Sequence, residues 1–110
     1  QHDLKFSVSD WMGSAFQAER GGELAEVSIR FNVQSAHYIR ERLWHATQRI
    51  EENDDGSLIL HFQTGGLKEV KRWVLQYGGD AEVLSPESLR QECIAEIMTM
   101  IKVYENNEND

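Results

Sequence analysis

The first clear periodicity runs from Glu26 to Val33, where hydrophobic and polar residues alternate. Alternation with period two predicts a β-strand with one buried and one exposed face. The buried face would carry Val27, Ile29, Phe31 and Val33. From Ser35 to Trp44 the spacing changes to three and four residues, which predicts an amphipathic helix.

The middle of the chain predicts a β-hairpin. Two strand-like segments, 47–52 and 57–64, flank the turn residues Asn53-Asp54-Asp55-Gly56. An Asp-Gly pair favours such a turn because both residues tolerate positive φ angles. Alternation in the second segment would turn Leu58, Leu60 and Phe62 toward the core.

Three further elements follow the hairpin. Segment 67–77 carries apolar residues at helical spacing and ends at Gly78-Gly79, a common helix stop. Segment 81–84 is a short strand. Ser85-Pro86-Glu87 then favours the start of a last helix, which would end near Tyr104.

The order of these elements is β, α, β, β, α, β and a final α. It predicts an α+β fold: a ferredoxin-like βαββαβ sandwich with an N-terminal connector and an additional C-terminal helix. Two helices would cover one face of an antiparallel sheet and leave the other face open. The open face and the last helix are therefore where function should be sought.

The last helix has more apolar surface than one core contact uses. At about 100° per residue, one stripe facing the core would consist of Leu89, Cys93, Ile97, Met100 and Tyr104. Three more residues widen the apolar arc to about 200° and are our interface candidates: Ile94, Met98 and Ile101. They would contact a second copy or a domain outside this sequence. The alternative is a helix set deeper in its own core, against Trp11 and Phe16.

Charge and composition narrow the class of protein. The 110 residues carry 11 Lys and Arg against 19 Asp and Glu, a net charge of −8, which argues against a broad nucleic-acid-binding face. The single cysteine excludes an internal disulfide, and no apolar run resembles a membrane span or signal peptide, so a cytoplasmic setting is expected. The chain starts at Gln1 rather than Met, which suggests a piece of a longer protein.

Two groups of residues are candidates for binding an effector. Arg30, Arg49 and His61 share the predicted open face, where they would suit a carboxylate or phosphate. The alternative is a solvated face on which the arginines pair with Glu26, Glu51 or Glu52.

Trp44 and His45 form the second group, because an indole stacks on planar ligands and an imidazole exchanges protons near neutral pH. The alternative here is a tryptophan packed on the sheet, with His45 hydrogen-bonded to a nearby carbonyl. The four histidines and Cys93 lack metal-ligand spacing and a catalytic partner, so we expect no metal, no cofactor and no enzymatic activity.

Several fixed spacings resemble one family. They are Trp44-His45-Ala46-Thr47-Gln48, Asp55-Gly56-Ser57 and the block from Glu69 to Arg90. Together they resemble the C-terminal extension, called WCX, of WYL-domain helix-turn-helix transcriptional regulators, over roughly 25–104. The resemblance implies a connector over 1–22 that leaves a WYL barrel, followed by the extension domain over 23–105. The remaining residues, 106–110, are polar and acidic and are expected to form a tail with nothing to bury.

The resemblance also implies a function. Such proteins are bacterial regulators in which this extension is implicated in dimerisation and signal response. We therefore expect a homodimeric regulatory domain that works with WYL and helix-turn-helix domains of the same parent chain, contacts DNA only through them and has no membrane partner. The alternative is an autonomous sensor that binds an anionic small molecule or nucleotide on the open sheet face.

Overall fold

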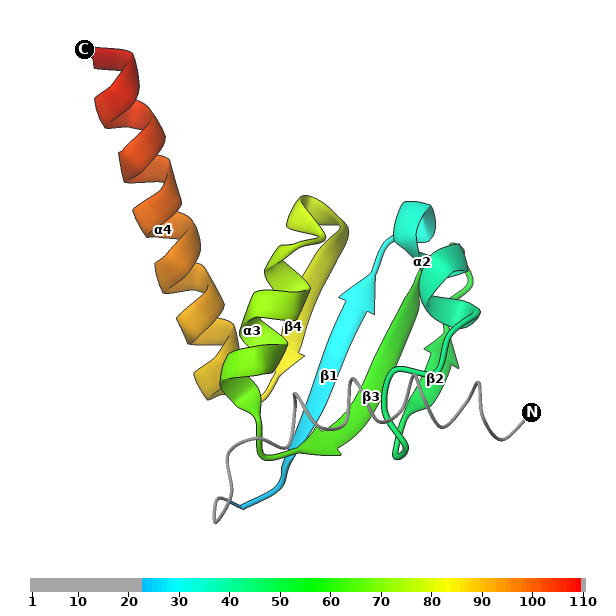
Figure 1. The fold of residues 1–110 in the computed structure, drawn as a ribbon. Coiled ribbons are helices and arrows are strands. Elements are labelled where there is room, and N and C mark those ends of the chain that lie inside the picture. Colours follow the sequence, from blue (N-terminus) through cyan, green and yellow to red (C-terminus); the bar gives the residue numbers. More distant parts are fainter. Residues whose placement is uncertain (1–22, 110) are drawn as a thin grey trace.

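The computed structural model describes residues 23–109. In chain order the elements are β1 (Ala25–Phe31), α2 (Val33–Arg40), β2 (Arg49–Glu52), β3 (Leu58–Thr64), α3 (Leu67–Leu75), the short 3-10 helix η1 (Gly78–Asp80), β4 (Ala81–Ser85) and α4 (Glu87–Asn109) (Figure 1). The predicted connector over 1–22 lies outside the described residues, and so does the predicted packing of Trp11 and Phe16 on the last helix.

The four strands form one sheet in the order β2-β3-β1-β4, and every neighbouring pair is antiparallel. Helices α2 and α3 lie on the same face of this sheet, while α4 runs beside β4 (Figure 1). The strand order and the βαββαβ sequence of elements are those of a ferredoxin-like fold. The predicted fold class is therefore confirmed.

The core lies between the sheet and the two covering helices. In the β1–β3 register Val27 faces Phe62, Ile29 faces Leu60 and Phe31 faces Leu58, and all six side chains are fully buried. Full burial of a side chain of this size contributes about 1.5–3 kcal/mol. The alternation that predicted these strands thus describes the centre of the core.

Helix α2 begins and ends earlier than predicted. The Asn32 side chain accepts a hydrogen bond from the backbone N–H of Ser35, so the helix is capped at Asn32 and Val33 becomes its first residue. Val33 is consequently 54% exposed instead of lying on the buried strand face. The helix ends at Arg40, which leaves Trp44 in the following loop rather than at a helix end.

Two other boundaries were predicted wrongly by two residues. Strand β2 begins at Arg49 rather than Thr47, because the Thr47 and Gln48 side chains are used inside the preceding loop. Helix α3 ends at Leu75 rather than Tyr77. The predicted turn glycines are used as expected, since φ is +92° at Gly56 and +56° at Gly78.

Helix α4 starts at Glu87 and continues to Asn109, past the predicted end at Tyr104 and through most of the predicted acidic tail. Its first turns enter the core through Leu89 and Cys93, which are buried. The predicted core-facing stripe is wrong beyond this point, because Ile97, Met100 and Tyr104 are exposed. Figure 1 shows the reason: the C-terminal half of α4 runs away from the sheet and α3.

Candidate functional site

The structure places Arg30, Arg49 and His61 on the sheet face that α2 and α3 leave uncovered. Arg49 of β2 lies directly opposite His61 of β3. Arg30 of β1 lies opposite Ile59, one alternation further along β3. Arg49 and His61 are therefore neighbours, and Arg30 is set apart at the end of the face near the hairpin turn.

Each arginine of this group already has an acidic partner. Nη2 of Arg49 lies 2.8 Å from Oε2 of Glu26, and this hydrogen bond lowers the pKa of Glu26. Nη2 of Arg30 lies 3.2 Å from Oδ2 of Asp55 in the turn, an acid that sequence reasoning did not pair with it. An incoming anion would have to displace these carboxylates.

His61 links three strands through its two ring nitrogens. Its Nδ1 lies 2.7 Å from Oγ of Ser28 on β1, and its Nε2 lies 3.0 Å from Oε1 of Glu51 on β2. Sequence reasoning placed His61 on this face but missed its link to Ser28. Only the register of the two strand pairs, which aligns His61 with Ser28, could have revealed it.

The loop from Arg42 to Gln48 is closed by the Gln48 side chain. Its Oε1 accepts hydrogen bonds from the backbone N–H groups of Trp44 and His45, at 2.6 and 3.1 Å, and its Nε2 donates to the carbonyl of Arg42 at 3.2 Å. The one side chain thus satisfies three main-chain groups that no helix or strand pairs. This requirement explains the spacing of the Trp44-His45-x-x-Gln48 motif.

The two ring side chains of this motif are buried in the domain. Trp44 donates its indole N–H to the carbonyl of Ile39 at 3.0 Å and lies 5.0 Å from the ring of Trp73. His45 stacks on Phe62, and its Nδ1 accepts the backbone N–H of Thr47 at 3.1 Å. Burial lowers the pKa of His45. These contacts are those of a loop packed on the sheet, in which Nδ1 of His45 accepts a backbone N–H.

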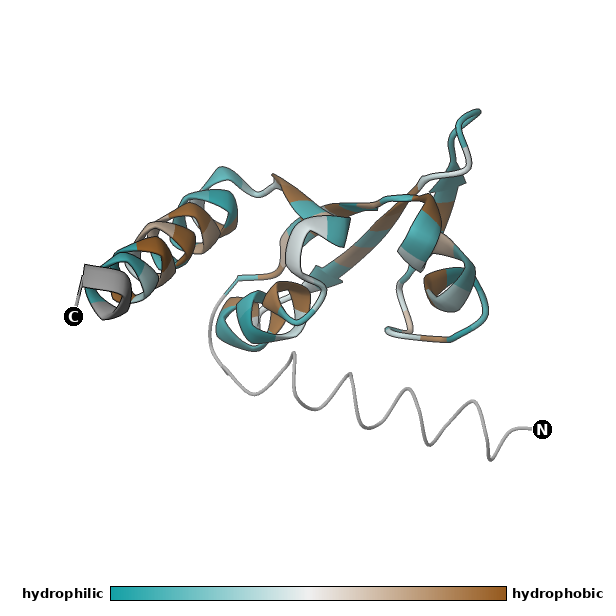
Figure 2. Ribbon diagram, turned by 90° about the horizontal axis from the view of Figure 1, so that it is seen from above, coloured by the Kyte–Doolittle hydropathy of each residue, from teal (hydrophilic) through white to brown (hydrophobic). Residues whose placement is uncertain are grey.

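The interface candidates on α4 are exposed. Ile94, Met98 and Ile101 have relative exposures of 38%, 54% and 48%. Together with two more exposed residues on the same side of the helix they form what we call the outer stripe: Ile94, Ile97, Met98, Ile101 and Tyr104. At about 200 Å² for a fully exposed side chain of this size, the stripe exposes roughly 500 Å², most of it apolar. Figure 2 shows that α4, which carries both apolar and polar segments, stands to one side of the sandwich.

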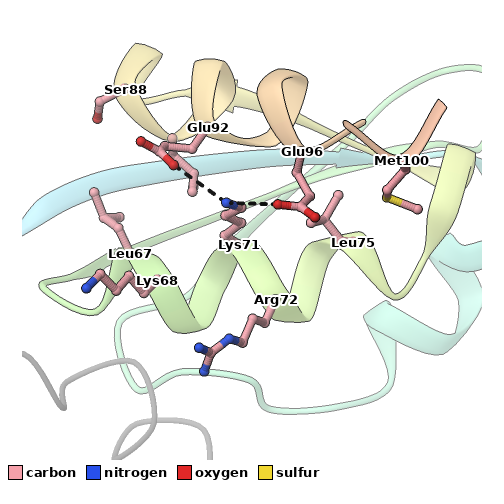
Figure 3. A pocket seen from close by; sticks show the side chains of 10 residues that line it. Leu67, Lys68, Lys71, Arg72, Leu75, Ser88, Glu92, Glu96 and Met100 are labelled. Atoms are coloured by element: carbon pink, nitrogen blue, oxygen red, sulfur yellow. Dashed lines mark ion pairs between the residues drawn. The ribbon is translucent and has the colours of Figure 1, made fainter. Parts of the chain in front are cut away.

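Two hollows flank α4. The groove between α3 and α4 has a volume of about 850 Å³, and Lys71 crosses it with its Nζ 3.5 Å from a carboxylate oxygen of both Glu92 and Glu96 (Figure 3). The smaller hollow, of about 160 Å³, lies on the other side of α4 beside β4, and Cys93, Ile94 and Ile97 are among its lining residues. Sequence reasoning found neither, because both depend on how α4 is tilted against its neighbours.

Two further observations on the described residues concern metal sites and membrane-spanning helices. Within 23–109 no group of three or more His, Cys, Asp and Glu side chains is arranged to hold a metal ion. No helix in that range combines the length and hydropathy that a membrane crossing requires.

Comparison with known families identifies the domain. A family model described as the WCX domain matches residues 23–101. The chain belongs to the WCX family. The match confirms the resemblance that the sequence predicted and places this WCX domain among the regulatory domains of WYL-family regulators.

The WCX domain is also similar to a solved structure, the proteasome accessory factor B/C (PafBC) of Arthrobacter aurescens. The two share 29% sequence identity with a TM-score of 0.54, over 68% of this chain and 11% of that chain. The match therefore spans about a ninth of the PafBC chain. The comparison with curated proteins found no significant match.

Proposed function

We propose that this WCX domain is a non-enzymatic regulatory module that holds two subunits of a transcription regulator together. In this proposal it passes an effector signal to WYL and helix-turn-helix domains of the same parent chain, and only those domains contact DNA. The setting is the bacterial cytoplasm. The observation that carries the proposal is the outer stripe of α4, which the described part of the chain leaves uncovered.

The size of the stripe suits a homodimer. A standard protein interface buries about 800 Å² per partner, and about 65% of a homodimer interface is apolar, which requires roughly 520 Å² of apolar surface. The outer stripe supplies about that much. It contains no charged residue, although the chain as a whole carries a net charge of −8. Two copies can therefore meet along it without bringing like charges together.

The signal would be passed by a shift between two arrangements of the dimer. An effector bound at the WYL barrel, or at its junction with this domain, would change how residues 6–16 are seated and so reorient the two copies. Such a ligand shifts the equilibrium only by its difference in affinity for the two arrangements. In both arrangements of the dimer, the two copies would stay in contact through α4.

Light scattering at two protein concentrations tests this proposal. We expect the 110-residue chain to form a dimer, and the double variant Ile94→Glu with Met98→Glu to be a monomer, because four carboxylates would then be buried together in the dimer. Val103→Glu is the matched control. It adds a charge at an equally exposed position, but at about 100° per residue Val103 lies on the opposite side of α4. A monomeric wild type, or a double variant that stays dimeric, would contradict the proposal.

A further inference from the structure

The small hollow beside β4 is large enough to hold one ring side chain. Its volume of about 160 Å³ is close to that of a cavity which holds a single benzene ring, about 150 Å³. Its apolar walls include Val74 of α3, Val83 of β4 and Cys93 of α4, and the ion pair between Arg90 and Glu82 also lines it. Val74, Val83 and Cys93 are themselves buried, so the hollow reaches down to the edge of the hydrophobic core.

The outer stripe carries an aromatic ring of the right kind. Tyr104 is 68% exposed, the highest value among the large hydrophobic residues that the structure describes. It lies eleven residues beyond Cys93 on the same helix, about 16 Å along the axis, so it is too far away to enter the hollow of its own copy. An exposed tyrosine of this kind is a frequent anchor residue at protein interfaces.

Symmetry brings the ring of one copy to the hollow of another. The exposed stripe runs from Ile94 to Tyr104, so its midpoint lies near residue 99. If two copies of α4 pack antiparallel about residue 99, two residues lie opposite each other when their numbers add up to about 198. Tyr104 of one copy then meets the level of Cys93 and Ile94 of the other. The two-fold axis also places the same side of each helix next to the same side of its partner. At about 100° per residue, Tyr104 and Cys93 lie on the same side of α4, so the ring of one copy lies on the side where the other copy has its hollow.

We infer that the α4 helices of two copies pack antiparallel and that the ring of Tyr104 from each copy fills the hollow beside β4 of the other. This inference rests on the proposed dimer and specifies how it is built. The occupant is a second copy because the exposed stripe and the hollow lie on the same helix, so one two-fold axis through the stripe can place the ring of each copy at the hollow of the other. The apolar area of the stripe matches what a homodimer needs.

Cross-linking through exposed engineered cysteines tests the contact directly. Cys93 is replaced by Ala in every variant, because burial raises the pKa of its thiol and makes it unreactive. When Ile94→Cys and Tyr104→Cys are combined, each thiol lies opposite one thiol of the second copy, so oxidised glutathione should convert most of the protein to a covalent dimer on a non-reducing gel. Ile94→Cys with Val103→Cys is the matched control and should give none, because the thiol at position 103 faces away from the stripe. Tyr104→Cys alone should also give none, since two thiols at position 104 would be about 15 Å apart.

The affinity of the dimer supplies a second measurement. Tyr104→Ala should weaken dimerisation by about 30-fold or more, as expected for an interface anchor, whereas Tyr104→Phe and Val103→Ala should change it by less than about threefold. A wild-type dimer in which the paired cysteines at 94 and 104 give no cross-link and Tyr104→Ala gives no weakening would overturn the inference and leave the proposed function standing. A monomeric wild type would overturn both.

Discussion

Replacing Gln48 by Ala tests whether the Trp44-His45-x-x-Gln48 motif is structural. The substitution removes the acceptor of two backbone N–H groups and the donor to the Arg42 carbonyl. A lost hydrogen bond of this kind costs about 1 kcal/mol, and water can replace part of it because Gln48 is only half-buried. We therefore expect the free energy of unfolding to fall by about 2–3 kcal/mol. For a domain of this size, that lowers Tm by roughly 10–20 °C.

Urea unfolding followed by circular dichroism measures this loss. Gln48→Met is the informative companion, because it keeps the length of the side chain and removes only its polar atoms, so it should lose about as much stability as the alanine variant. Gln34→Ala is the matched control. Gln34 is exposed on α2, and its replacement should change stability by less than about 0.5 kcal/mol.

The outcome separates the two interpretations of the motif. If Gln48→Ala and Gln48→Met both stay within about 0.5 kcal/mol of the wild type, the three hydrogen bonds do not hold the loop, and the structural reasoning is refuted. The motif would then have to be explained by a ligand. A loss of the expected size would instead mean that the spacing is needed for folding, whether or not an effector binds nearby.

Two further predictions concern the fold. Burial lowers the pKa of His45, so the unfolded chain binds a proton before the folded one does as pH falls below about 6.5, and stability should decrease there by up to about 1.4 kcal/mol per pH unit. Urea unfolding at pH 7.5 and 5.5 measures this change in the free energy of unfolding. The change should be smaller in His45→Gln than in the control His37→Gln, whose ring is exposed, and equal changes in the two variants would contradict the prediction. Gly56→Ala should cost about 1–2 kcal/mol, because φ is positive there and the new Cβ would lie 3.0 Å from Val33. Gly79→Ala, with no atom within 4 Å of its Cβ, should be nearly neutral, and similar costs at both glycines would contradict this reasoning.

Periodicity predicted the parts of the fold in which burial alone decides the structure. Strands β1 and β3 alternate because one face meets the core, and that alternation is written in their residues. The ends of helices and strands were predicted less accurately where a side chain forms a hydrogen bond with a nearby backbone group. The Asn32 cap moved Val33 from strand to helix, and the use of Thr47 and Gln48 in the loop shortened β2.

The sequence predicted the exposed interface candidates of the site but not the hydrogen-bond partners of its polar residues. The exposed face of α4 follows from the width of its apolar arc, so Ile94, Met98 and Ile101 could be named from the sequence. The partners of Arg30 and His61 could not be, because they depend on the register between strands and on the position of the hairpin turn. The exposure of Tyr104 was missed because periodicity does not tell where a helix leaves the domain.

The buried first turns of α4 and its exposed C-terminal part are constrained differently. Leu89 and Cys93 belong to the core, whereas none of the exposed residues from Ile94 to Tyr104 does. In the proposed dimer, substitutions within that short segment would therefore alter which surfaces recognise each other while the sandwich keeps its stability. Related regulators in one cell could evolve separate pairing preferences through changes confined to half a helix, with the fold that carries them left intact.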